Sequence, residues 1–331
     1  MTTIKEIAQL ANVSSSTVSR VLNDGYVSDE VRRRVLKIIE ETGYVPSEHA
    51  KSLRTKRTNV IGVVLPRLNT EASIRTVNAL NDELAKEGYQ IILANTNLKQ
   101  EKEIENINLL KSRQVDGMIL FATNRNRRLT DEIRQLNIPL IAIGQEIPDV
   151  SIVVNDDYGA AREMTDRLIA QGHERIGFIG VTEEDHAVGY LRKQGYLDSL
   201  KAHRLEIKEE WTAEAHFDFD SGYQAMKSIR EQSVHLPTAV FAATDTIAVG
   251  AMQYLKEQHF SIPEDIALVG TGNSNIGQYL DPALTTIDFQ NADTGREAAR
   301  LLLHHIQHPG SKPVRKVMGY RLIERDSVLW L

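Results

Sequence analysis

Residues 4–23, with the sequence IKEIAQLANVSSSTVSRVLN, contain two short helical patterns that are separated by a turn. The first helix is predicted to begin at a capping box formed by Thr3 and Glu6. Its apolar positions fall on one face of the helix, and they are Ile4, Ile7, Ala8 and Ala11. The second helix can be capped by Ser14, and its core side carries Val18, Val21 and Leu22. This arrangement is typical of a helix-turn-helix unit, whose second helix lies in the major groove of DNA.

The outer face of the second helix presents short hydroxyl side chains and one arginine, namely Ser15, Ser16, Thr17, Ser19 and Arg20. Short hydroxyl side chains let the backbone approach the groove closely. An arginine can donate two hydrogen bonds to guanine O6 and N7. We therefore predict that this helix reads DNA bases, and an ordinary helical hairpin is the alternative.

A third helix is predicted between its cap, Ser28, and Gly43, which ends it. The basic run Arg32–Arg34 on this helix is either a phosphate contact or a solvated face. The following segment, EHAKSLRTKRT, carries Lys51, Arg54, Lys56 and Arg57. It is too short to form a stable helix alone. It either becomes ordered against DNA or a second copy of the chain, or acts as a flexible linker.

Composition and charge set limits on the class of protein. A chain of 331 residues with 41% apolar and 25% charged residues suits two or three globular domains. The absence of an apolar run of about 18 residues and of a secretory signal predicts a cytoplasmic protein without a membrane span. The sequence has no cysteine, which excludes disulfides. Residues 1–57 hold ten Lys/Arg and seven Asp/Glu, whereas the whole chain has a net charge of −6, so a basic head precedes an acidic body.

From Asn59 onward, short apolar runs alternate with helical stretches such as 73–87 and 101–113. The first set of predicted strands is 60–65, 89–95, 115–121, 138–144 and 151–155, and the second is 175–180, 239–244, 266–272 and 285–288. Two successive sets predict two doubly wound parallel sheets, with ligands beyond the carboxyl ends of the strands and a cleft between the two lobes.

The head resembles that of the lactose-repressor family of bacterial transcription regulators. The matching residues are I-x-x-I-A-x-x-A-x-V-S-x-x-T-V-S-R-V-L-N at 4–23, Val27-Ser28, G-Y-x-P at 43–46, and A-x-x-L from Ala50 to Leu53. The resemblance continues through the body and implies an α/β fold with a two-lobed, periplasmic-binding-protein-like body. The implied domains are a head at 1–46, a hinge helix at 47–58 and a body at 59–331. Within the body it implies an N-lobe at 59–157 and 291–319, a C-lobe at 158–290 and 320–331, and crossings near 156–160, 288–291 and 318–321.

The resemblance implies roles for residues of the head and hinge. Ser15, Ser16 and Arg20 correspond to base-reading positions, while Thr17 and Ser19 contact phosphate or the groove wall. In the hinge, where Ala50 also matches, Leu53 corresponds to the leucine that wedges into the minor groove and kinks the duplex. Two hinges meet at that wedge, which implies a homodimer on a pseudo-palindromic operator. No apolar heptad tail follows the body, so we expect a dimer and not a tetramer built through such a tail.

The resemblance also implies effector residues at the strand ends. In the C-lobe, Arg192 corresponds to the ligand-binding arginine and can form a fork onto vicinal hydroxyls; Phe217 either stacks on ligand or packs in the core. Asp245 either binds ligand or caps the next helix. The N-lobe candidates are Arg67, Asn69 and Ser73, and Asp185 and Gln145 are further candidates. The family's usual aspartate after glycine is missing at Gly270-Thr271-Gly272-Asn273, where Asn273 can supply a neutral amide.

The resemblance, together with the polar residues of the cleft, implies a repressor of a carbohydrate-utilisation operon that a small sugar, such as the disaccharide sucrose, releases from its operator, and co-repression by the sugar is the alternative. We expect no cofactor, no metal site and no catalytic residues, because no carboxylate–histidine cluster occurs in the sequence. One alternative is a global carbon-catabolite regulator of the same family whose partner is a phosphorylated carrier protein. Another is a sugar-binding transport receptor, which shares the body fold.

Overall fold

The computed structural model describes residues 2–44 and 57–329. The chain divides into two compact units, Met1–Thr58 and Asn59–Leu331. Most of the predicted hinge, including Ala50 and Leu53 and the basic residues Lys51, Arg54 and Lys56, lies outside the described residues. Within the described part of the chain, no helix is long and apolar enough to cross a membrane.

The head consists of three helices, α1 (Ile4–Leu10), α2 (Ser15–Leu22) and α3 (Asp29–Thr42). Thr3, Ser14 and Ser28 cap these helices as predicted, and Thr3 and Glu6 form the full capping box. Gly43 ends α3 with a left-handed φ of 60°, a conformation that glycine adopts without strain. One small core holds the three helices together, and its buried members are Ile7, Ala8, Ala11, Val18, Val21 and Val35.

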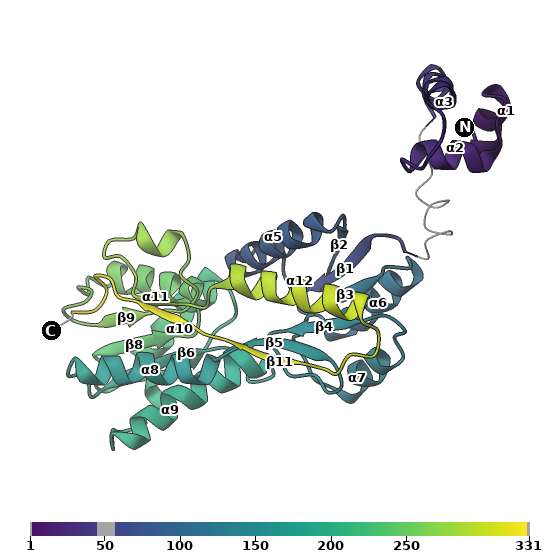
Figure 1. Ribbon diagram of the computed structural model, residues 1–331. Helices are drawn as coiled ribbons and strands as arrows, with labels where there is room; N and C mark the ends of the chain where they lie inside the picture. Colours follow the sequence, from purple (N-terminus) through teal and green to yellow (C-terminus); the bar gives the residue numbers. More distant parts are fainter. Residues whose placement is uncertain (1, 45–56, 330–331) are drawn as a thin grey trace. The chain divides into compact units, whose positions relative to one another are not determined.

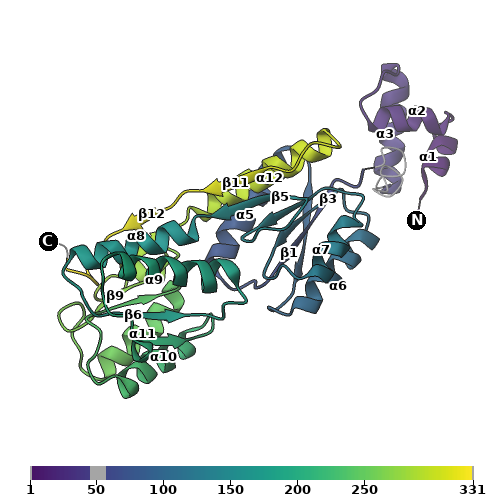
Figure 2. The same ribbon diagram turned by 90° about the horizontal axis from the view of Figure 1, so that it is seen from below.

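The N-lobe of the body is a parallel sheet in the order β11-β5-β4-β3-β1-β2. Its strands are β1 (Val60–Leu65), β2 (Gln90–Asn95), β3 (Gly117–Phe121), β4 (Leu140–Ile143), β5 (Ser151–Asn155) and β11 (Arg315–Met318). Figures 1 and 2 show α5 (Glu71–Lys86) and α12 (Asn291–Gln307) on one face of this sheet. The other face is covered by α6 (Gln100–Ser112) and α7 (Arg127–Arg134). Alternate strand residues therefore pack into two separate apolar layers.

The C-lobe is a second parallel sheet in the order β7-β6-β8-β9. Its strands are β6 (Ile176–Gly180), β7 (Thr212–Glu214), β8 (Ala239–Ala242) and β9 (Ala267–Val269). One face packs against α8 (Asp157–Ala170) and α9 (Arg192–Ala202). The other face packs against α10 (Phe219–Gln232) and α11 (Asp245–Glu257). The predicted fold class is confirmed.

Two details of the predicted sheets were wrong. The segment 285–288 was expected to be a strand of the second parallel sheet. Thr285 does form a parallel bridge to Val269 of that sheet, but β10 (Thr286–Asp288) pairs antiparallel with β12 (Arg321–Ile323) in a separate two-stranded sheet. The strands β7, β11 and β12 were not predicted. They have only three or four residues each, and β11 reads Arg-Lys-Val-Met with mostly exposed side chains. Short and partly charged edge strands carry little of the apolar signal on which strand prediction depends.

The chain passes between the two lobes at three places, which lie between β5 and α8, between β10 and α12, and between β11 and β12. The loop after β1 contacts the loop after β7, because Arg67 reaches Phe217, and the start of α5 contacts the loop after β9, because Arg75 reaches Asn275. The carboxyl ends of the strands of both sheets therefore face the boundary between the lobes.

Candidate functional site

The predicted DNA-reading residues lie on one helix, α2. Ser15, Ser16 and Arg20 are exposed, and Thr17 and Ser19 are half-buried beside them. The hydroxyl of the cap Ser14 lies 2.7 Å from that of Ser16 and 2.9 Å from that of Thr17, and it accepts the Thr17 backbone N–H. The cap thus fixes the first turn of the helix. Within the described residues no ion pair involves the Arg20 guanidinium, which remains available for a base edge.

The second region is the interlobe site, formed by residues that follow the strands of both lobes. Its N-lobe members are Arg67 to Arg75, Thr96, Gln145 and Asn155, and its C-lobe members are Asp185 to Arg192, Phe217, Asp245 and Gly270 to Asn275. All of the predicted effector residues belong to it. Thr96, Asn155, Glu71 and Arg75 were not predicted, although the first two stand at the ends of predicted strands, where ligand contacts gather.

Arg192 lies at the start of α9 and is 7% exposed. Its Nε donates to Asp157 Oδ1 at 2.8 Å, and its Nη2 lies 2.7 Å from the same oxygen. Its Nη1 donates to Ala243 O and Thr271 Oγ1, each at 2.5 Å, and the guanidinium stands 4.8 Å from the centre of the Phe289 ring. These contacts use most of the five N–H donors. Beyond these contacts with the described residues only Nη2 retains a free N–H, and the fork onto vicinal hydroxyls stays a prediction.

Asp185 helps to place Arg192. Its carboxylate accepts the Val188 backbone N–H at 3.0 Å and so caps the π-helical turn His186–Leu191, which leads directly into α9. Burial raises the pKa of Asp185, and the hydrogen bond to Val188 acts in the opposite direction. Burial also raises the pKa of Asp157, while Arg192 beside it favours the ionised form. Asp157 thus pairs directly with the buried arginine, and Asp185 interacts with it electrostatically without a hydrogen bond.

Asp245 is the first residue of α11 and is 2% exposed. The suggestion that it caps this helix was wrong, because the cap is Thr244, whose hydroxyl accepts the Ile247 N–H at 3.2 Å. Asp245 instead accepts the Ser274 N–H at 2.6 Å and the Thr286 hydroxyl at 2.5 Å. Burial raises the pKa of Asp245, whereas these hydrogen bonds lower it. The carboxylate therefore fastens the loop that follows β9.

Asn273 belongs to the same loop and has a left-handed φ of 46°. Its amide oxygen accepts a hydrogen bond from Arg325 Nη2 at 2.7 Å. Its backbone N–H donates to the Thr286 hydroxyl at 3.2 Å. The amide that was expected to substitute for the missing family aspartate thus has its oxygen engaged within the C-lobe.

The N-lobe candidates differ in their surroundings. Arg67 donates to the carbonyl oxygen of Phe217 at 2.9 Å, and its guanidinium lies 5.7 Å from the Phe217 ring centre. Phe217 also packs against the C-lobe core, which agrees with the core-packing alternative, while its stacking on a ligand stays a prediction. Ser73 is buried and receives a hydrogen bond from Thr70 at 2.7 Å. Asn69 is exposed.

Several buried polar atoms at the carboxyl edge of the N-lobe sheet have no hydrogen-bond partner among residues 2–44 and 57–329. The side-chain amide nitrogen and oxygen of Gln145, which is 3% exposed, lack a partner. Asn155 Oδ1, at the end of the neighbouring strand, also lacks one. Thr96 Oγ1 is in the same state at the end of β2. An unsatisfied buried polar group costs about 1–3 kcal/mol, so such atoms are normally met by water or a ligand. The interlobe site therefore offers donors and acceptors to a polar molecule.

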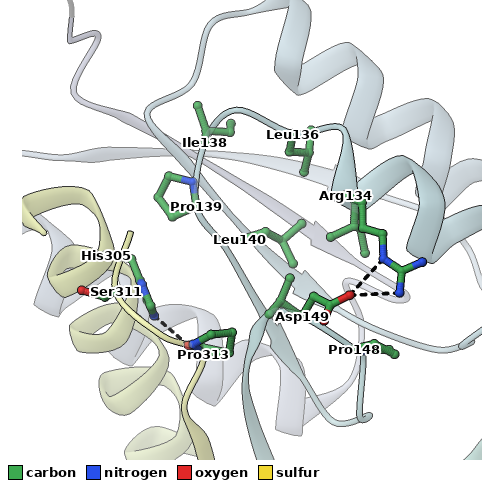
Figure 3. A pocket seen from close by; sticks show the side chains of 13 residues that line it. Arg134, Leu136, Ile138, Pro139, Leu140, Pro148, Asp149, His305, Ser311 and Pro313 are labelled. Carbon is green, nitrogen blue, oxygen red and sulfur yellow. Dashed lines mark hydrogen bonds and ion pairs between the residues drawn. The ribbon is translucent and has the colours of Figure 1, made fainter. Parts of the chain in front are cut away.

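A cavity of about 290 Å³ lies elsewhere in the N-lobe, at the amino ends of β4 and β5. Figure 3 shows Pro139 and Leu140 between the Arg134–Asp149 ion pair and His305. This cavity contains none of the predicted effector residues, and it opens at the edge of the sheet opposite to the interlobe site.

Two family models match the chain. The model of the bacterial regulatory proteins of the lacI family matches residues 3–47, and that of the periplasmic binding protein-like domain matches residues 165–328. The first match contains the whole of α1, α2 and α3, and the second lies in the body. Both agree with the resemblance inferred from the sequence.

Individual relatives match nearly the full length. The ribose operon repressor of Haemophilus influenzae is 33% identical over 332 residues, which cover 99% of each chain. The sucrose operon repressor of Staphylococcus xylosus is 34% identical over 310 residues, which cover 93% of this chain and 95% of the relative. The crystal structure of the lac repressor dimer bound to operator and the anti-inducer ONPF has a TM-score of 0.87 at 25% identity and covers 99% of each chain. These relatives are transcriptional regulators, and the chain belongs to the lacI family of bacterial regulatory proteins.

Proposed function

We propose that the protein is a sequence-specific repressor of a carbohydrate-utilisation operon, and that a small sugar bound at the interlobe site releases it from its operator. The observation that carries the DNA-binding part is the exposed face of the capped helix α2, with Ser15, Ser16 and Arg20 side by side. Hydroxyls and an arginine on the first turns of such a helix are suited to base edges in the major groove. The proposed activity includes no catalytic step, and it places the protein in the cytoplasm with its DNA.

The effector part rests on the chemistry of the interlobe site. The unpartnered atoms of Gln145 and Asn155 include both a donor and acceptors, which match the hydroxyls of a neutral sugar. Arg192 Nη2 adds one charged donor from the C-lobe. Two relatives control ribose and sucrose operons by name, so a pentose and a disaccharide are the first ligands to test. A sugar that bridges both lobes would favour one relation between them over another.

A homodimer is proposed because two heads are needed on a pseudo-palindromic operator. The N-lobe provides exposed apolar side chains at its β2 edge, an apolar patch made of residues from β2, the loop after it and the two flanking helices. These residues are Ile74, Ile92, Leu93, Leu98 and Leu109, and each is more than two-fifths exposed. A second copy of the chain that covers this patch would remove apolar side chains from water and protect an open sheet edge.

Arg20→Ala is expected to weaken binding to the specific operator by about 1–3 kcal/mol while affinity for random DNA changes much less. The reason is that a forked arginine–guanine contact discriminates between bases, whereas a phosphate contact does not. Fluorescence anisotropy with both DNAs at one fixed salt concentration measures the two affinities. Arg33→Ala on α3 is the matched control, because it removes an equal charge outside the reading helix. Equal losses of affinity for the operator and for random DNA would mean that Arg20 contacts only phosphate.

Titration calorimetry with ribose and with sucrose tests the effector. One of them is expected to bind with a stoichiometry of one per chain, and the same sugar should lower operator affinity. Gln145→Leu should weaken that binding by roughly tenfold or more, because a hydrogen bond to the sugar is lost. The same variant should unfold at higher urea concentration than the natural protein, since it removes two unsatisfied buried atoms. Failure of both sugars, and of their phosphates, to bind would overturn the effector assignment but leave the Arg20 result standing.

A further inference from the structure

The loop Gly270 to Asn275, where the chain departs from its family's usual pattern, is held firmly within the C-lobe. Asp245 accepts the Ser274 N–H, and Arg325 donates to Asn273. The Gly272 N–H donates to Ile287 O at 2.8 Å, and Gly272 has a φ of 130°, which favours glycine. A β-carbon at Gly270 would lie 2.4 Å from Asp245 Oδ1, so the carboxylate and the loop backbone are in close contact. The loop is therefore a fixed surface of the C-lobe.

The start of α5 in the N-lobe meets this surface directly. The two carboxylate oxygens of Glu71 accept the Asn275 backbone N–H at 2.8 and 3.1 Å. Arg75 Nη2 donates to Asn275 Oδ1 at 3.0 Å, and Arg75 Nη1 lies 3.5 Å from Gly272 O. Arg75 Nη2 also donates to Glu71 at 2.9 Å, one helical turn away. Glu71 thus supplies an acceptor for the backbone of Asn275, and Arg75 supplies a donor for its side chain.

The N-lobe half of this contact is as well defined as the C-lobe half. Thr70 caps α5 by accepting the Ser73 N–H at 3.3 Å, which fixes Glu71 in the first helical turn. The contact remains accessible to water, because the Glu71 and Arg75 side chains are 36% and 29% exposed. Two rigid surfaces joined through partly hydrated polar groups can separate without leaving buried polar atoms unsatisfied.

We propose that Glu71 and Arg75 form a latch that holds the two lobes closed by gripping Asn275. The latch needs no effector, and so it does not depend on the sugar proposed above. The latch also links lobe closure to the apolar patch, because Ile74 of that patch lies on α5 between the two latch residues. Opening the latch frees the first turns of α5 from the C-lobe, next to the surface on which a second copy is proposed to pack.

Hydrogen exchange of the full-length protein, without any added ligand, tests the latch. Glu71→Ala is expected to speed exchange of the Asn275 amide by about tenfold or more, a factor that corresponds to about 1.4 kcal/mol. Exchange within the β-strands of both lobes should stay unchanged, because each sheet keeps its own core. Glu231→Ala is the matched control, since it removes the carboxylate of another i,i+4 pair, with Lys227, within α10. That control should leave the Asn275 amide at its natural rate.

The charge-swapped variant Glu71→Arg/Arg75→Glu distinguishes the latch from a role of the two residues in stabilising helix α5 alone. It keeps an i,i+4 ion pair and the net charge, but it places donors opposite the Asn275 N–H. Fast Asn275 exchange in both this variant and Glu71→Ala, with strand protection retained, supports the latch. An Asn275 amide that exchanges in either variant at the rate of the unsubstituted protein would overturn the latch, because the C-lobe alone would then protect the amide.

Discussion

Replacing Arg192 with alanine is expected to lower the free energy of unfolding of the body by about 3–5 kcal/mol, the typical cost of leaving one partner of a buried ion pair behind. The side chains of Arg192 and Asp157 are 8% and 4% exposed, so solvent screens their interaction very little. The variant leaves the Asp157 carboxylate in a buried site without its cation. It also leaves Ala243 O and Thr271 Oγ1 without the donor that Nη1 supplies.

Urea unfolding at several pH values measures this loss and gives its sign. In the variant, burial raises the pKa of Asp157 and the opposing effect of Arg192 is absent. An acid whose pKa is raised in the folded state binds its proton more readily there than in the unfolded chain. The stability deficit of Arg192→Ala should therefore be largest near neutral pH and shrink as the pH falls. A deficit that stays constant over pH would mean that Asp157 is not the source.

The double variant Arg192→Ala/Asp157→Ala is the control that separates the ion pair from lost packing. It removes both charges, so it should be more stable than Arg192→Ala alone despite losing more atoms. Asp157→Ala by itself leaves a buried guanidinium that keeps only its neutral partners, and it should also be destabilised strongly. Equal stability of the double variant and Arg192→Ala would contradict an ion-pair explanation.

Arg192 also shows how far the sequence could predict the site. Its position after a predicted strand, in a segment that resembles the family, was sufficient to place it at the lobe boundary. Its partners could not be foreseen, because Asp157, Ala243 and Thr271 come from three other segments that only the folded chain brings together. The same limit applies to Asp245, whose neighbour Thr244 has the β-region backbone of a helix cap, so that Asp245 points toward Ser274 instead.

The fold was predicted more completely than the site. Buried parallel strands are continuous apolar runs, and β1 matches its predicted bounds of 60–65 without error. Helix caps such as Ser14 depend only on residues within one turn, so they too can be recognised locally. The latch illustrates the opposite case. Glu71 and Asn275 are 204 positions apart, and neither belongs to a pattern that indicates the other.

Gly295→Ala is expected to destabilise the N-lobe by about 3 kcal/mol, at the upper end of the range for overpacking. A β-carbon added at Gly295 would lie 2.2 Å from Thr76 O and 3.1 Å from Leu80 N, where α12 crosses α5. Both atoms belong to the α5 backbone, so they cannot move aside as the end of a flexible side chain can. The helices must separate, although alanine alone favours a helix by about 1 kcal/mol over glycine.

Thermal or urea unfolding of Gly295→Ala beside Gly319→Ala measures the effect. Gly319 has nothing within 4 Å of its added β-carbon, and its substitution should change the free energy of unfolding by no more than about 0.5 kcal/mol. Because α5 carries Glu71 and Arg75, displacement of this helix should also speed hydrogen exchange of the Asn275 amide. If Gly295→Ala matched Gly319→Ala in stability, α5 and α12 would have to be packed less closely than the structure shows.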